Sequence, residues 1–119
     1  MSAFARESCI GVLAAACLQK EGETAGDGQY SDCYEREAQV WDERLNAAYR
    51  DAQGRMEKDA GKNVQKVQRA WIAWRDASCA QPWITFQGSM AAPMQADCML
   101  DLTARQAIWM EGWAEEPGQ

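Results

Sequence analysis

The sequence contains no histidine among its 119 residues. Because histidine is the usual general base and the commonest metal ligand, its absence excludes Ser-His-Asp and Cys-His catalytic sites within the chain. Hydrolysis would then depend on carboxylate pairs, such as Glu37 with Asp42 or Asp97 with Asp101, which stand at ordinary spacings of a solvent-facing helix. A glycosidase also requires a shaped sugar cleft. We therefore expect no catalytic residue, no metal ion and no cofactor, and predict that the protein is not an enzyme.

The chain also lacks a long apolar run and an excess of positive charge. No segment approaches the roughly 18 apolar residues of a transmembrane helix, so we expect no membrane span. The net charge is -6, from 18 acidic and 12 basic residues. This argues against nucleic-acid binding, because contact with phosphates requires a basic surface. An acidic protein is better suited to a basic partner.

No two of the five cysteines form a C-x-x-C pair, the pattern typical of zinc sites and thioredoxin-like sites. Five cysteines in a chain of this length indicate an oxidising compartment instead. We therefore expect the protein in the periplasm or outside the cell. Because the count is odd, at least one thiol is left over or pairs with another chain.

The cysteine positions suggest two disulfides. Cys79 and Cys98 stand at the end of one predicted helix and the start of the next, and joining them closes a ring of about 20 residues. Cys33 has Cys17 as its favoured partner across a glycine-containing segment, with Cys9 as the alternative. Cys9 and Cys17 themselves would lie about 12 Å apart on one continuous helix, too far for a disulfide.

The N-terminal segment has some features of an export signal. Residues 10–17 resemble a short signal-peptide core that ends in a crude lipoprotein box, with Cys17 as the residue to be lipidated. However, Glu7 and Cys9 precede the apolar run, and the run is short. We favour the interpretation that the natural signal peptide is absent and that residues 1–8 form an N-terminal tail. Lipid anchoring stays open as the alternative.

Hydrophobic spacing predicts a long amphipathic helix in the first half of the chain. We expect a short helix over residues 9–18 and a loop over 20–31, which has three glycines and no apolar period. Asp32 and Glu35 form a capping-box pattern where the long helix should begin. Its apolar stripe comprises Tyr34, Ala38, Trp41, Leu45, Ala48, Tyr49 and Ala52. We expect the chain to reverse near residues 60–62.

Two more helices are predicted in the second half. The apolar positions of the first are Val64, Val67, Trp71 and Trp74. We expect it to reach about Cys79 and to be closed by Pro82, with an irregular loop over residues 82–92. Pro93 suits the first turn of a last helix, and residues 115–119 resemble a frayed tail. With no strand-like alternation, we predict an all-α fold: one domain over residues 1–119, a disulfide-stapled bundle of three main helices plus a short N-terminal helix.

Four polar residues lie beside the apolar stripes: Asp42, Asn46, Arg75 and Asp76. A half-buried arginine usually needs a carboxylate partner, which its planar guanidinium can bind while stacking on an indole. We interpret the four residues as an interhelical polar network that fixes helix register, with a recognition surface as the alternative. The helical spacing of the tryptophans at positions 41, 71 and 74 predicts core packing.

Three motifs carry a resemblance to a known family. They are Cys33-Tyr34-Glu35-Arg36-Glu37 followed by residues 41–49, the run from Arg69 to Cys79, and Gly88-Ser89 followed by Cys98 and residues 102–105. Together they resemble the LprI-like lysozyme inhibitor N-terminal domain family over roughly residues 17–109. The resemblance implies a small, exported, disulfide-bonded helical domain that inhibits lysozyme, and it supplies no catalytic residue. The chain departs from the usual pattern in its short connection between the long helices, in having both Cys9 and Cys17, and in Gln87 where Gly-Gly-Ser is common.

The segment from residue 81 to 93 is the favoured partner-binding surface, because loops carry binding functions disproportionately. Its candidate contact residues are Trp83, Phe86, Gln87, Gly88, Ser89 and Met90. Lysozyme uses two carboxylates in a cleft, so we predict that this loop occludes the cleft of a basic lysozyme. The structural alternative is a hydrophobic lid over the bundle.

An alternative function is that of a periplasmic adaptor or structural envelope domain. It would bind another envelope protein or peptidoglycan fragments through a basic stripe, Lys58, Lys62, Lys66 and Arg69. The sequence does not indicate the oligomeric state.

Overall fold

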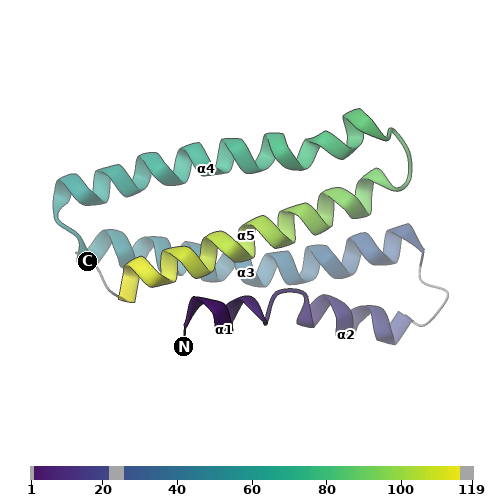
Figure 1. The fold of residues 1–119 in the computed structure, drawn as a ribbon, viewed down its shortest axis with the longest axis horizontal. Coiled ribbons are helices and arrows are strands. Elements are labelled where there is room, and N and C mark those ends of the chain that lie inside the picture. Colours follow the sequence, from purple (N-terminus) through teal and green to yellow (C-terminus); the bar gives the residue numbers. More distant parts are fainter. Residues whose placement is uncertain (1, 22–25, 116–119) are drawn as a thin grey trace.

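The computed structural model describes residues 2–21 and 26–115, and these residues form five helices and no strand. The helices are α1 (Ala3–Glu7), α2 (Val12–Glu21), α3 (Asp27–Arg55), α4 (Lys58–Thr85) and α5 (Ala91–Glu115). The three long helices run alongside one another in a body of 51 × 31 × 19 Å, with α1 and α2 on the side away from α4 (Figure 1). The predicted all-α bundle is confirmed. None of the described helices is long and apolar enough to span a lipid bilayer.

The hydrophobic core lies mainly between α3 and α5. To this core α3 contributes Trp41, Leu45, Ala48 and Ala52, and α5 contributes Leu100, Ala104, Ala107, Ile108, Met110 and Ala114. Alanines on both helices allow their backbones to approach closely, and burial of Leu45 and Leu100 contributes about 1.5–3 kcal/mol each. The helix α4 contributes Val64 to this buried cluster, and its partly buried Trp71 packs against the edge of the cluster. α4 is therefore the most peripheral of the long helices.

A buried carboxylate attaches α2 to α3. Glu37 of α3 is 1% exposed and accepts hydrogen bonds from the backbone N–H groups of Gly11 (2.7 Å) and Ala14 (2.8 Å) and from Nε1 of Trp41 (2.9 Å). The two backbone donors lie at the start of α2, where the helix dipole favours negative charge. The expectation that Glu37 faces solvent is therefore wrong, and its carboxylate fixes the entry of α2 onto the core.

Two disulfides connect neighbouring helices. Cys17 of α2 is bonded to Cys33 of α3, and Cys79 of α4 is bonded to Cys98 of α5. The fifth cysteine, Cys9, is a free thiol and is exposed. The Cys17–Cys33 bond lies one helical turn from Glu37 on α3, so a covalent and a polar attachment act at adjacent positions.

The helices α3 and α4 both begin earlier in the sequence than expected. α3 starts at Asp27, not near Asp32, and the side chain of Gln29 accepts the N–H of Gly26 at 2.9 Å. The predicted loop over residues 20–31 is therefore partly helical, and residues 22–25 of it lie outside the described part. The turn between α3 and α4 lies at residues 56–57, whereas Gly61 is buried inside α4. Gly61 lies close to α3, since its carbonyl accepts Nε2 of Gln53 at 3.1 Å.

Pro82 does not end α4. The helix continues to Thr85, and the carbonyl of Pro82 still accepts the N–H of Phe86 at 2.9 Å. A proline removes only its own helical N–H bond, and the Cys79–Cys98 disulfide holds this end of α4 against α5. The irregular segment is thereby shortened from the expected residues 82–92 to residues 86–90.

The N-terminal residues form a docked helix where a tail was expected. Ser2 caps α1 by accepting the N–H of Ala5 at 3.1 Å, and Arg6 forms ion pairs with Glu111 and Glu115 of α5. Residues 116–119 of the expected C-terminal tail lie outside the described residues.

Candidate functional site

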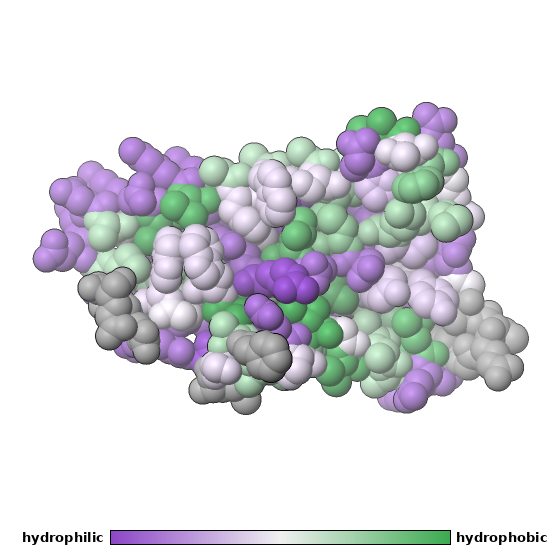
Figure 2. All heavy atoms as spheres, viewed as in Figure 1, coloured by the Kyte–Doolittle hydropathy of each residue, from purple (hydrophilic) through white to green (hydrophobic). Residues whose placement is uncertain are grey.

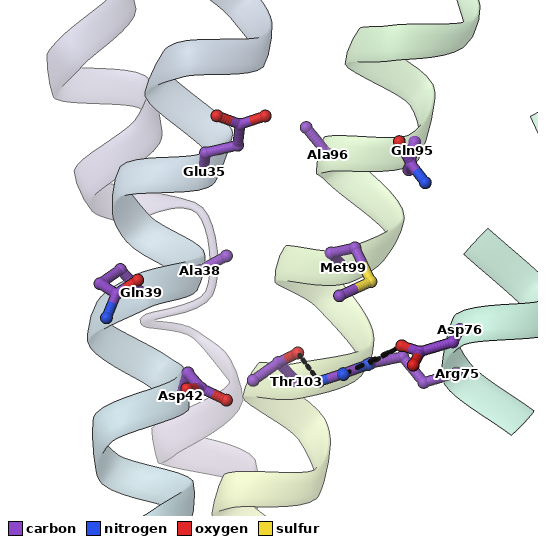
Figure 3. A pocket seen from close by; sticks show the side chains of 10 residues that line it. All are labelled: Glu35, Ala38, Gln39, Asp42, Arg75, Asp76, Gln95, Ala96, Met99 and Thr103. Carbon is purple, nitrogen blue, oxygen red and sulfur yellow. Dashed lines mark hydrogen bonds and ion pairs between the residues drawn. The ribbon is translucent and has the colours of Figure 1, made fainter. Parts of the chain in front are cut away.

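A groove of about 630 Å³ opens between α3, α4 and α5. Its lining residues are Glu35, Ala38, Gln39 and Asp42 from α3, Arg75 and Asp76 from α4, and Gln95, Ala96, Met99 and Thr103 from α5. Figure 3 shows α5 running between the two other helices, so that α5 forms the floor and α3 and α4 form the walls. The groove exists because α5 is packed closely on α3, while α4 lies farther out (Figure 1).

Arg75 is fixed in the α4 wall by three partners. Its Nε donates to Oδ1 of Asp76 at 3.0 Å, and its Nη1 lies 3.4 Å from Oγ1 of the buried Thr103. The guanidinium carbon also lies 4.9 Å from the ring centroid of Trp71, within range of a cation–π interaction. The Arg75 side chain is thus held in place, and the charge it carries is directed toward its neighbour Asp76.

The four residues of the expected interhelical network form two local pairs. Asn46 donates to Asp42 at 3.4 Å within α3, and Arg75 pairs with Asp76 within α4. The bond from Arg75 to Thr103 crosses between helices, a contact the sequence reasoning missed. Within the described residues, no hydrogen bond or ion pair joins Asp42 or Asn46 to Arg75.

The groove carries an excess of negative charge. Three carboxylates, those of Glu35, Asp42 and Asp76, face one guanidinium, that of Arg75, so the formal charge of the lining is -2. In the part of the chain that the structure describes, neither Glu35 nor Asp42 pairs with a lysine or arginine. Figure 3 shows both side chains directed from α3 toward α5, with Ala38 between them.

A second feature, the apolar tip, is formed by Trp83, Ile84, Phe86 and Met90, where α4 passes into α5. Ile84 is 65% exposed, Phe86 56% and Met90 62%. Figure 2 shows green, apolar atoms at this end of α4, at the upper right, interspersed with hydrophilic ones. Trp83 is held in place because its Nε1 donates to Oε1 of Gln95 at 2.9 Å. Gln95 also lines the groove, so the groove and the apolar tip are neighbours.

The backbone at the apolar tip contains a left-handed residue. Gln87 has φ of 50°, a conformation that favours glycine, and the next residue is Gly88. The carbonyl of Gly88 accepts the N–H of Ala91 at 2.9 Å, which starts α5. The predicted binding residues of this segment are thus part helix end and part short turn, exposed to solvent and not folded over the bundle as a lid.

A smaller hollow of about 250 Å³ lies beside the apolar tip and is lined by Asp27, Tyr30, Tyr34, Met90, Pro93, Met94 and Asp97. Burial, with a smaller effect from Asp97, raises the pKa of Tyr34 above its ordinary value. Burial, with a smaller effect from Asp101, raises the pKa of Asp97. Both shifts favour the uncharged form, as expected for groups beside apolar side chains.

Comparison with known protein families identifies the family of the chain. The sequence model of the family described as Lysozyme inhibitor LprI matches residues 17–109. The chain belongs to this family. The matched region contains both disulfides, the groove and the apolar tip, whereas α1 lies outside it. No curated protein and no solved structure is significantly similar to the chain.

The three tryptophans at positions 41, 71 and 74 have different environments. Trp41 is buried in the core, Trp71 is half-buried beside Arg75, and Trp74 is 54% exposed. The prediction that all three pack in the core is therefore wrong for Trp74, because the peripheral helix α4 has only one covered face. Among the described residues there is no group of three or more cysteine, aspartate or glutamate side chains suited to a metal ion.

Proposed function

We propose that this member of the family is exported and binds lysozyme without catalysing a reaction, blocking the substrate cleft with the apolar tip. The observation that carries the proposal is the exposure of Ile84, Phe86 and Met90 on one end of the molecule. Large apolar side chains grouped on a surface mark a protein-binding site, because their burial in a complex is favourable. Membership of an inhibitor family supports lysozyme as the partner.

The build of the apolar tip suits insertion into a cleft. The Cys79–Cys98 disulfide and the Trp83–Gln95 hydrogen bond hold it, so little conformational freedom is left to lose on binding. Gln87 and Ser89 flank the apolar side chains and offer amide and hydroxyl groups. A cleft that binds sugar hydroxyls near two carboxylates presents complementary polar groups.

Disulfides and charge support an extracytoplasmic encounter with a basic partner. Two disulfides are stable in the periplasm or outside the cell, where lysozyme acts on the wall. The net charge of -6 raises the association rate with a basic lysozyme, and this contribution falls as salt is added.

The test is a cell-wall lysis assay with lysozymes of several classes at low salt. We expect inhibition at micromolar concentrations, weakened about tenfold or more in Ile84→Ala/Phe86→Ala, since central apolar contacts dominate such interfaces. The matched control is Leu13→Ala/Val40→Ala, which removes exposed apolar side chains from α2 and α3. Equal inhibition by the two double variants would contradict the role of the apolar tip. Failure to inhibit any lysozyme class would refute the proposed function.

A second candidate function, an envelope adaptor, is favoured by the basic stripe Lys58, Lys62, Lys66 and Arg69. All four are exposed on α4, and none forms an ion pair with an acid in the described residues. The test is binding of purified peptidoglycan fragments and of periplasmic proteins to wild type and to Lys62→Glu/Lys66→Glu. Unchanged binding by the charge-reversed variant would exclude this role.

A further inference from the structure

The groove between α3, α4 and α5 has the form of a vacant helix position in a bundle. Its floor contains Ala96, Met99 and Thr103, which follow one another at intervals of three and four residues on α5. Ala38 stands on the facing side of α3. Small and flexible apolar side chains at helical spacing leave room for the side chains of another helix, in the manner of ridges packing into grooves.

The acidic residues of the α3 wall have a regular spacing. Glu35 and Asp42 are seven positions apart, which is two helical turns or about 10 Å along the axis. Each points toward the groove and neither is neutralised by a cation of the described chain (Figure 3). Arg75 is occupied by Asp76, Thr103 and Trp71, so it does not supply the missing positive charges.

We propose that this groove binds one face of a basic amphipathic helix from another protein, with two lysine or arginine side chains seven residues apart paired to Glu35 and Asp42. Apolar side chains between the two basic residues contact Ala96 and Met99 on the floor and Ala38 on the α3 wall. This is the helix-in-groove mode of recognition, in which spacing along the bound helix determines specificity. The proposal goes beyond lysozyme inhibition, because binding in the groove requires no contact with the apolar tip.

Charge complementarity and groove length together select this occupant. An acidic or neutral helix would cover Glu35 and Asp42 without supplying a cationic partner to either, which is unfavourable. A basic helix with a different spacing would satisfy only one of the two carboxylates. The groove should therefore distinguish peptides of identical composition by the spacing of their basic residues.

The experiment measures the binding of two fluorescent peptides by anisotropy at low salt. Both are amphipathic helices of about 14 residues with leucine on one face and two arginines, separated by seven residues in the probe and by five in the control. We expect the probe to bind wild type at least fivefold more tightly than the control peptide. Glu35→Gln/Asp42→Asn should weaken probe binding about tenfold and reduce its salt dependence. Glu43→Gln/Asp59→Asn, which removes two exposed charges outside the groove, should leave binding unchanged.

A steric variant gives a second readout that does not depend on charge. Ala38→Phe should fill the groove and abolish probe binding, with its helical circular dichroism retained as evidence of folding. Equal affinity for the two peptides, or probe binding unaffected by Glu35→Gln/Asp42→Asn, would overturn the proposal. The proposal would also be overturned if the protein formed a concentration-dependent dimer that is lost both in Glu35→Gln/Asp42→Asn and in Lys62→Glu/Arg69→Glu. That result would assign the groove to a second copy of the chain.

Discussion

The attachment of α2 through Glu37 leads to a quantitative prediction for Glu37→Ala. The substitution leaves three donors without their acceptor: the buried N–H of Ala14, the buried indole N–H of Trp41 and the partly buried N–H of Gly11. Each unsatisfied buried donor costs about 1–3 kcal/mol. Part of this is recovered because the start of α2 can move toward water while the Cys17–Cys33 bond keeps the helix tethered. We therefore expect the free energy of unfolding to fall by about 3 kcal/mol.

Urea unfolding followed by circular dichroism measures this change, and hydrogen exchange locates it. The matched control is Glu43→Ala, an exposed glutamate on the same helix, which should alter stability by less than about 0.5 kcal/mol. In Glu37→Ala the amides of Gly11 and Ala14 should exchange much faster, whereas those of Leu45 in the core should change only as global stability does. If Glu37→Ala and Glu43→Ala have the same stability, the carboxylate does not attach α2.

Three further predictions concern the α4–α5 connection and its surroundings. Replacing Cys79 and Cys98 by serine opens a ring that spans 19 positions and should lower the free energy of unfolding by about 3 kcal/mol, measured by urea unfolding. A loss below about 1 kcal/mol would contradict a stabilising role of this disulfide. Gln87→Gly relieves the left-handed backbone and should raise the free energy of unfolding by up to about 1 kcal/mol in the same assay, whereas destabilisation would refute the strain at this residue. The pKa of Asp97 in the folded protein is raised by burial and, to a smaller extent, by Asp101. Just above pH 3.8 the folded protein therefore holds a proton at Asp97 that the unfolded chain has released, so the free energy of unfolding falls as pH rises through that range. Asp97→Asn should remove this fall in a pH series of urea midpoints, and an unchanged pH profile would contradict it.

The central helices could be predicted from the sequence because their pattern is regular. Trp41, Leu45, Ala48 and Ala52 recur at the helical period and are the residues that α3 contributes to the hydrophobic core. Placing Cys79 at the end of one helix and Cys98 near the start of the next suggested a covalent link between adjacent helices. The spacing of residues along the chain was sufficient to predict the buried face of α3 and the Cys79–Cys98 disulfide, because both depend directly on that spacing.

The helix boundaries could not be predicted, because tertiary contacts override local preference there. Three glycines and a polar composition favoured a loop before Asp32, yet Cys33 is tied to α2 and Tyr30 contacts Tyr34 with ring centroids 6.1 Å apart. Pro82 favoured a helix end, but the neighbouring disulfide keeps α4 on α5. Propensity is a weak guide where such attachments exist.

The groove and the buried glutamate were missed for different reasons. Glu37 stands four positions after Cys33 and four before Trp41, so its place between two buried positions was the available signal. Its charge suggested a solvent-facing role, because glutamate is almost never buried unless hydrogen-bonded. The groove depends on how far α4 lies from α3, and that distance results from the packing of three helices.

The exposed thiol of Cys9 provides a single point for site-directed coupling. All five cysteines lie in the described residues, and the other four are consumed in disulfides. Cys9 joins α1 to α2, on the side of the bundle away from α4 (Figure 1). Maleimide attachment to a biosensor chip in the absence of reductant would therefore orient every molecule alike, with the α4 face turned to the flowing analyte.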